Sequence, residues 1–224
     1  MKNLVISLTA IAIAIFLSGN VYSQSGFSIH AGPSFPLSDF GDDDMEDDDS
    51  GLAGVGLSLG GKYLYQLNDK GLGLSFGADF NLNGLKSDVK DDIEDELSDS
   101  DADIKFSKYI NVPVIAGLNY SYKTNDQISL FGDFGIGADF LKVTDMTIEE
   151  DNEEGVLSYK LSTQFAYKIG GGLVVNDKFI IGLHYNGLGE HNLKGEYKYD
   201  GESEDMEDRE LKVSLLTLTF GIKL

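Results

Sequence analysis

Asp and Glu side chains are the most numerous groups in this sequence that could do chemistry. The chain holds 38 of them against 17 Lys and Arg, which gives a formal net charge of −21. Thirty of the 38 fall in four stretches, residues 38–50, 84–104, 144–158 and 199–210. Because such a charge repels nucleic acid and anionic surfaces, we expect no nucleic-acid partner.

Carboxylates in a run could hold a cation. The segment from Asp42 to Asp49 offers the oxygen ligands that Ca²⁺ prefers. It lacks the D-x-[DN]-x-[DN]-G spacing of a calcium-binding loop, so we interpret the four stretches as solvated, partly disordered and self-repelling. We therefore predict no ordered metal site and no cofactor, and leave divalent cations or extracellular partners open as loose partners of these stretches.

Catalysis has one candidate group, formed by Glu190, His191 and Ser203. Neighbouring residues of a strand face opposite ways, so Glu190 and His191 cannot easily form a dyad. The sequence holds no G-x-S-x-G, H-E-x-x-H or G-x-x-x-x-G-K-[ST] motif. We predict that the protein is not an enzyme and that His191 is an interfacial residue at a strand rim.

Three short turns separate the segments that must position these groups. Each carries the dipeptide Asn-Asp, at 68–69, 125–126 and 176–177. Asn and Asp tolerate the positive φ that tight hairpins require. The flanking segments alternate apolar and polar residues, which predicts antiparallel strands joined by tight turns on one side and by the four acidic stretches on the other.

The alternation is clearest after Gly71, and similar patterns give eight strands in all. One face of that segment is apolar, with Leu72, Leu74, Phe76, Ala78, Phe80 and Leu82. The opposite face consists of Gly, Ser and Asn with an occasional charge, which suits the crowded inside of a narrow barrel. A soluble barrel would turn its apolar face inward. Bulky apolar residues with aromatic residues near strand ends instead indicate a lipid-facing exterior, and the aromatic residues are Tyr63, Tyr65, Tyr120, Tyr122, Tyr159 and Phe179.

Charged residues that share the inward phase could line a pore. They are Lys62, Asp79, Asp133, Asp139, Lys160, Lys168 and Glu190, with His30 and His184. An eight-stranded barrel is only wide enough for its own side chains, so we interpret these groups as a structural network of ion pairs. Pro113 also points inward and has no N–H to donate, so we expect the ladder to be interrupted within two residues of it, by a bulge or a kink, and to resume by Ala116.

The N-terminal residues have the pattern of an export signal. Lys2 is followed by an apolar segment from Leu4 to Leu17, which is shorter than the about 20 residues of a spanning helix. We expect residues 1–23 to be a cleaved signal peptide and residues 24–224 to be one β-barrel domain. The sequence has no Cys, which excludes disulfides and an acylated-cysteine anchor.

Two stretches carry a family resemblance. The segment Tyr109-Ile110-Asn111-Val112-Pro113-Val114 and the ending Phe220-Gly221-Ile222-Lys223-Leu224 resemble the outer-membrane β-barrel proteins of Bacteroidota, the PorT-like or porin-family group, at a size like that of OmpX. The ending departs from the family pattern in closing on Leu instead of Phe or Trp. The resemblance implies a place in the outer membrane and little about activity.

These observations predict an all-β fold: an eight-stranded antiparallel up-and-down transmembrane β-barrel with four long acidic extracellular loops. We expect it in the outer membrane of a Gram-negative cell, in contact with outer-membrane lipid and, during insertion, with the barrel assembly machinery. The predicted role is structural or surface interaction, with a side-chain-filled interior. A narrow transport pore and a lipid-modifying enzyme are the alternatives.

Overall fold

The computed structural model describes residues 25–45, 47, 49–96, 103–150, 153–199 and 202–224, so the predicted signal peptide lies outside the described residues. The barrel strands are β1 (Gly26–Pro36), β2 (Gly56–Gln66), β3 (Leu72–Gly84), β5 (Lys108–Asn111), β6 (Val114–Lys123), β7 (Ile128–Val143), β10 (Ser162–Val175), β11 (Phe179–Leu193) and β14 (Arg209–Lys223). A second sheet contains β4 (Asp103–Lys105), β8 (Met146–Glu150), β9 (Glu153–Tyr159), β12 (Gly195–Tyr199) and β13 (Glu202–Asp205). The 3-10 helix η1 (Ser38–Gly41) and the helix α2 (Ser87–Glu96) complete the elements.

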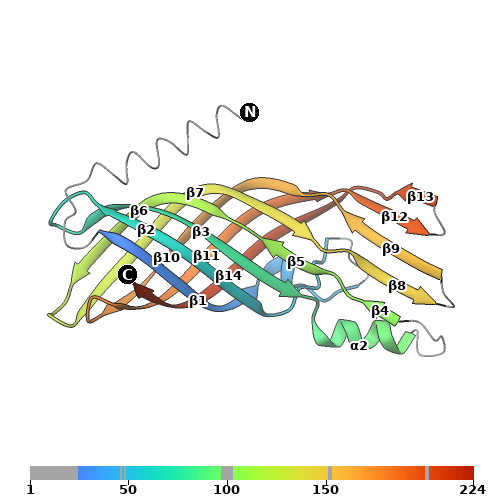
Figure 1. Ribbon diagram of the computed structural model, residues 1–224, viewed down its shortest axis with the longest axis horizontal. Helices are drawn as coiled ribbons and strands as arrows, with labels where there is room; N and C mark the ends of the chain where they lie inside the picture. The colour runs from blue at the N-terminus through green and yellow to red at the C-terminus, as the bar shows by residue number, and fades with distance from the viewer. Residues whose placement is uncertain (1–24, 46, 48, 97–102, 151–152, 200–201) are drawn as a thin grey trace.

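The barrel strands form a closed antiparallel ring. β14 pairs with β1, and β7 pairs with both β6 and β10, so the sheet has no free edge. β5 and β6 are two halves of one strand, since both lie between β3 and β7. The ring therefore has the eight strands that the alternation predicts (Figure 1).

The outside of the ring is apolar and the inside is polar at mid-height. Phe134 of β7, Phe165 of β10 and Leu183 of β11 are each half exposed or more, at 53%, 61% and 50%. Between them along the strands, Asp133 and His184 are buried in the interior. This is the reverse of a water-soluble barrel and confirms the predicted direction of the apolar face.

The three Asn-Asp turns lie together at one end of the barrel, here called the turn end. Only Asn176 and Asp177 adopt the predicted positive φ, at 51° and 52°. The other two turns are closed by an asparagine side chain, because Asn68 Oδ1 accepts from the amides of Lys70 and Leu72, and Asn125 Oδ1 accepts from the amides of the residues two and three positions after it. Asparagine closes all three turns by two different mechanisms.

Pro113 interrupts its strand as predicted. β5 ends at Asn111 and β6 begins at Val114, and the register on both neighbouring strands is the same before and after the break. The Pro113 carbonyl accepts from the amide of Asp79 at 3.1 Å, and the reciprocal bond is missing because proline has no N–H. The interruption is a local loss of pairing with no extra residue, so it is not a bulge.

A real bulge lies in β11, and it corrects one prediction. The pairing with β14 shifts register between Gly187 and Gly189, and Gly189 has a φ of +93°. The extra residue reverses the alternation beyond it, so that Glu190 is exposed and His191 is wholly buried inside the barrel. Lys160 was also expected inside, but it lies exposed between β9 and β10.

The acidic stretches are more ordered than predicted. At the end of the barrel opposite the turns, the loop end, β8, β9 and β12 continue beyond barrel strands and pair with β4 and β13 in the order β13-β12-β9-β8-β4 (Figure 1). The stretch 84–104 contains α2, which is anchored by the buried Val89. Among the residues that the structure describes, no helix has the length and apolar character to cross a membrane.

Candidate functional site

The interior at mid-height is filled by two carboxylates and their partners. Asp133 accepts from Lys62 Nζ at 2.8 Å and from the Asn119 amide at 2.8 Å, and His184 Nε2 lies 3.4 Å away. Each partner comes from a different strand, so the network ties the ring together across its interior. The predicted structural network of ion pairs is therefore present in the interior.

The second carboxylate, Asp79, bonds to His30 Nε2 at 2.7 Å and accepts from Lys168 Nζ. Gly60 makes this cluster possible, since a Cβ added there would come within 2.0 Å of Asp79 Oδ1. The small residues of the inward phase therefore provide the space that the charged groups occupy.

The described interior retains little free volume. One cavity of about 40 Å³ lies beside Asp79 and Asp133, and another of about 70 Å³ opens near Lys123 and Lys223 at the turn end. These spaces hold one or a few water molecules, since a water takes about 30 Å³ in the liquid.

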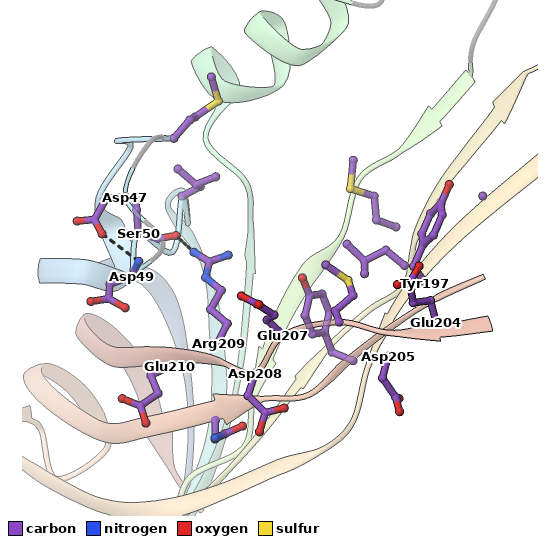
Figure 2. A pocket seen from close by; sticks show the side chains of 18 of the residues that line it. Asp47, Asp49, Ser50, Tyr197, Glu204, Asp205, Glu207, Asp208, Arg209 and Glu210 are labelled. Atoms are coloured by element: carbon purple, nitrogen blue, oxygen red, sulfur yellow. Dashed lines mark hydrogen bonds between the residues drawn. The ribbon is translucent and has the colours of Figure 1, made fainter. Parts of the chain in front are cut away.

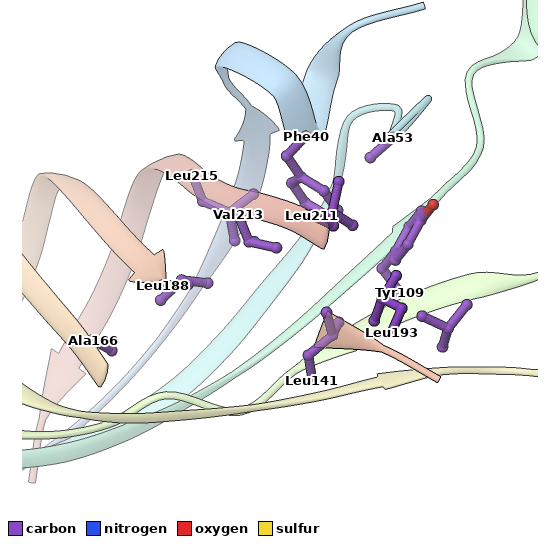
Figure 3. Packing of buried hydrophobic residues seen from close by; sticks show 11 residues of the cluster. Phe40, Ala53, Tyr109, Leu141, Ala166, Leu188, Leu193, Leu211, Val213 and Leu215 are labelled. Atoms are coloured by element: carbon purple, nitrogen blue, oxygen red, sulfur yellow. The ribbon is translucent and has the colours of Figure 1, made fainter. Parts of the chain in front are cut away.

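The loop end of the barrel is closed by an apolar plug. Phe40 of η1 inserts into the mouth, where it meets Tyr109 edge-to-face at 5.0 Å between ring centroids. The Tyr109 hydroxyl donates to the Gly51 carbonyl at 2.8 Å and so fastens the segment after η1. The buried members of the plug are Phe40, Ala53, Tyr109, Leu141, Val143, Ala166, Leu188, Leu193, Leu211, Val213 and Leu215 (Figure 3).

A large hollow lies above this plug, and we call it the cup. Its volume is about 1160 Å³, and it is formed by the second sheet, by residues 204–210 and, from the segment after η1, by Asp44, Met45, Asp47, Asp49, Ser50 and Leu52 (Figure 2). The cup is far larger than either cavity inside the barrel. It is therefore the main candidate site of the molecule.

One wall of the cup is apolar. Met146 and Ile148 of β8, Leu157 and Tyr159 of β9, and Tyr197 of β12 line it. Tyr159 was predicted to lie in the aromatic belt of the barrel, but it is half-buried in this wall. The belt at the turn end does contain Tyr120, Tyr122 and Phe179, whose side chains are 53%, 58% and 53% exposed.

The rest of the cup lining is mostly acidic. Its carboxylates are Asp44, Asp47, Asp49, Glu204, Asp205, Glu207, Asp208 and Glu210. The only cation among the described lining residues is Arg209, whose guanidinium donates to the Ser50 carbonyl and so joins β14 to the segment after η1 (Figure 2). Lys194 lies 3.3 Å from Asp208 at the outer side.

Two ion-pairing carboxylates lie outside the lining. Asp43 receives a hydrogen bond and the attraction of Lys86 at 3.1 Å, which together hold the pKa of that carboxyl below its ordinary value of 3.8. The Ser203 hydroxyl, and then Lys198, lower the pKa of Glu196 in the same way. Both carboxylates are ionised at neutral pH, so the acidic end keeps its charge.

The predicted catalytic candidates are not brought together. His191 Nε2 donates to the Leu188 carbonyl at 3.0 Å and lies 3.2 Å from Asp139 Oδ2, and both side chains are fully buried. Ser203 bonds to Glu196 on the second sheet. His191 is therefore an interior residue, and the prediction that it is interfacial is wrong.

The acidic stretches are the places where the sequence offers ligands for a metal ion. Within the described ranges, no group of three or more His, Asp or Glu side chains lies close enough to hold one metal ion. Loose attraction of cations to the acidic lining stays a prediction.

The apolar wall of the cup was missed because the acidic composition hid it. The signal was present as apolar residues two positions apart, Met146 with Ile148 inside the acidic stretch 144–158 and Leu157 with Tyr159 at its end. That period is the same one that identified the barrel strands.

Comparison with known proteins agrees with this architecture. Among solved structures, a major outer membrane protein from Thermus thermophilus is 12% identical, with 89% of this chain and 99% of that chain covered at a TM-score of 0.53. OprG from Pseudomonas aeruginosa is 14% identical over 89% and 96% of the two chains, with a TM-score of 0.48. Ail, the attachment invasion locus protein of Yersinia pestis, is 18% identical over 89% and 97%, with a TM-score of 0.43.

At these identities the Thermus structure supports the fold alone. The search of curated proteins found no match. The family model for the outer membrane protein beta-barrel domain, in contrast, matches residues 6–221, which is nearly the whole sequence. The chain therefore belongs to the outer membrane protein beta-barrel domain family.

Proposed function

We propose that this protein is a non-enzymatic surface-interaction barrel whose loop end faces the outside of the cell. One observation carries the proposal: the contrast between the cup of about 1160 Å³ and interior cavities of about 40 and 70 Å³. The space suited to a ligand lies above the barrel, and the two cavities described inside it are far smaller. Because the large hollow lies at the loop end, partners bind in the cup and not inside the barrel.

The orientation is part of the same proposal. Short turns face the periplasm and long segments face outward in bacterial barrels of this kind, which supports an outward cup. The acidic residues of the loop end also favour the aqueous side. We further propose a cleaved signal at residues 1–23, insertion by the barrel assembly machinery and a Bacteroidota-type, PorT-like origin in a Gram-negative cell, from the sequence patterns given above.

Conductance in planar bilayers tests the closed interior. We expect no stepwise current from the purified barrel, because the ion pairs of Asp79 and Asp133 fill the lumen and the plug closes its mouth. Phe40→Ala removes part of the plug and leaves the ion pairs, so it should stay silent as well. Sustained conductance of the unaltered protein would establish the pore alternative and end the proposal.

Single-cysteine labelling tests the orientation, and the absence of native Cys makes it simple. Ser203→Cys, in the second sheet, should react with an impermeant maleimide on intact cells. Asp126→Cys, whose side chain is fully exposed at the turn end, should react only after the outer membrane is permeabilised. The reverse labelling pattern would place the cup in the periplasm.

Lipid turnover tests the absence of enzymatic activity. The buried position of His191 denies it access to lipid from outside the barrel. Incubation with labelled lipopolysaccharide or phospholipid should give no product. Turnover that His191→Ala abolishes would show that the protein is a lipid-modifying enzyme.

A further inference from the structure

Three apolar side chains of the cup are exposed to solvent: Tyr197 of the apolar wall, and Met45 and Met206, which line the cup beside that wall. Met45, Tyr197 and Met206 are 48%, 42% and 41% exposed, and they come from three separate segments that converge on the same hollow. Single apolar residues on a surface are ordinary, but a group lining a concave site marks a place where a partner binds.

Methionine is concentrated at this site. The sequence has four Met, and the three beyond Met1 all line the cup, at positions 45, 146 and 206. Methionine has a flexible, polarisable side chain that adapts to differently shaped apolar groups, and it is common on surfaces that accept varied partners. The wall therefore suits flexible apolar side chains of variable shape better than one rigid ligand.

The acidic residues define the charge of the occupant. Eight carboxylates line the cup, and the one guanidinium among them, that of Arg209, is engaged by the Ser50 carbonyl. This excess of negative charge repels an anionic ligand and gives a neutral ligand no electrostatic attraction. A second copy of this chain, with its net charge of −21, is a poor occupant for the same reason.

The volume of the cup favours a peptide over a small cation as its ligand. Sites for drug-sized molecules take about 300–1,000 Å³. The cup exceeds that range at about 1160 Å³ and is open to solvent on the side of the acidic residues. It has room for an extended segment of several residues.

We infer that the cup binds a cationic peptide segment with bulky apolar side chains. This inference rests on the proposed function, because it needs the loop end to be the binding face. The apolar side chains of the peptide pack on Met146, Tyr197 and Met206, and its Lys or Arg side chains pair with carboxylates such as Glu204 and Glu207. The charge attracts the peptide over a distance, and the apolar wall selects it among cations.

Fluorescence anisotropy with labelled synthetic peptides tests the inference, using the full barrel in nanodiscs. A short peptide that alternates Lys and Leu should bind, and binding should weaken as salt rises. Matched peptides that alternate Lys and Ser, or Glu and Leu, should bind at least about tenfold more weakly, which is about 1.4 kcal/mol. Equal binding of the Lys-Ser peptide would show attraction by charge alone and would overturn the inference.

Two triple variants separate the cup from the charge of the whole molecule. Glu204→Gln, Glu207→Gln and Glu210→Gln together should weaken binding of the Lys-Leu peptide about tenfold. Asp88→Asn, Asp91→Asn and Asp95→Asn on α2 remove the same charge away from the cup lining and should leave the affinity unchanged. An equal loss in both variants would overturn the inference.

A third variant changes apolar residues of the cup, two from the apolar wall and Met206 beside it. Met146→Ser, Tyr197→Ser and Met206→Ser together should reduce Lys-Leu binding to the level of the Lys-Ser peptide. Heat-modifiable migration in a detergent gel checks that the barrel is intact, and if this variant does not fold, the charge variants decide. Failure of every peptide to bind would refute this inference, whereas the proposed function is refuted by conductance, lipid turnover or reversed labelling.

Discussion

The closed barrel and the five-stranded sheet are built from continuous segments of the chain, yet their apolar faces point in opposite directions. β7 exposes Phe134 to the outside and buries Asp133, whereas β8, which follows it, directs Met146 into the cup. A strand surrounded by lipid has to expose apolar groups, and a strand surrounded by water has to cover them. The change of direction therefore marks the level at which the surrounding medium changes.

The largest expected effect comes from the interior of the barrel. Asp133→Ala leaves Lys62 without its carboxylate at a buried site and should reduce the free energy of unfolding by about 3–5 kcal/mol. Urea-induced unfolding in lipid vesicles measures this. Asp205→Ala in β13 is the control, since that side chain is exposed and its removal should cost no more than about 0.5 kcal/mol. A small effect of Asp133→Ala would mean that water in the interior hydrates the Lys62 ammonium group once its carboxylate is removed.

A charge on the lipid-facing side of the barrel should be the next most costly. Phe134→Lys, near mid-height of β7, should destabilise the inserted barrel by about 2–4 kcal/mol. Val156→Lys on β9 places the same charge on the second sheet, which is surrounded by water, and should cost clearly less than Phe134→Lys. The same unfolding experiment compares them, and equal costs would show that both sheets lie in one medium.

The Tyr109 hydroxyl is one of the groups that fasten the junction between the two regions. Tyr109→Phe keeps the ring against Phe40 and removes the bond to the Gly51 carbonyl, which should cost about 1 kcal/mol. Hydrogen exchange should become faster at the Ala53 amide, which is bonded to the Phe40 carbonyl, and should stay unchanged in β7. Tyr122→Phe, exposed at the turn end, is the control and should alter neither region.

The smallest effect is a pH dependence confined to the loop end. Because Lys86 lowers the pKa of Asp43 in the folded protein, this pair stabilises the fold above pH 3.8, and the contribution is lost as the pH falls through the lowered value. Carboxyl NMR of Asp43 should show a pKa below 3.8 that rises toward the ordinary value in Lys86→Met. An unshifted pKa in the unaltered protein would show that the pair does not form in solution.

The barrel could be predicted from the sequence because every strand alternates inward-facing and outward-facing residues under the same physical constraints. At mid-height the inward positions are small or paired and the outward positions are apolar, so residues such as Leu74 and Phe76 reveal their strand without reference to a partner. Pro113 could be predicted in the same way, since the loss of a donor is a local property. The phase of the charged residues also predicted the ion pairs of Asp79 and Asp133, although it placed Lys160 and Glu190 inside wrongly.

Two features could not be predicted in this way. The bulge at Gly189 adds one residue to β11, so Glu190 lies outside the barrel and His191 inside it. The alternation of residues before the bulge gives no sign of this extra residue. The second sheet depends on pairing between acidic stretches distant in sequence, such as β9 with β12. Their composition is typical of disorder, and the pairing of strands that continue from the barrel strands overrides it.

The five-stranded sheet differs from the barrel in one more respect: it has edges. β13 and β4 end the order of the sheet, and β13 presents Glu202, Glu204 and Asp205. Two molecules drifting side by side in a crowded membrane would bring these carboxylates together before their backbones could pair. At physiological ionic strength the repulsion extends about 8 Å, so it acts only between near neighbours. The acidic edge thus sets a minimum spacing between copies, and lateral crowding becomes sensitive to salt.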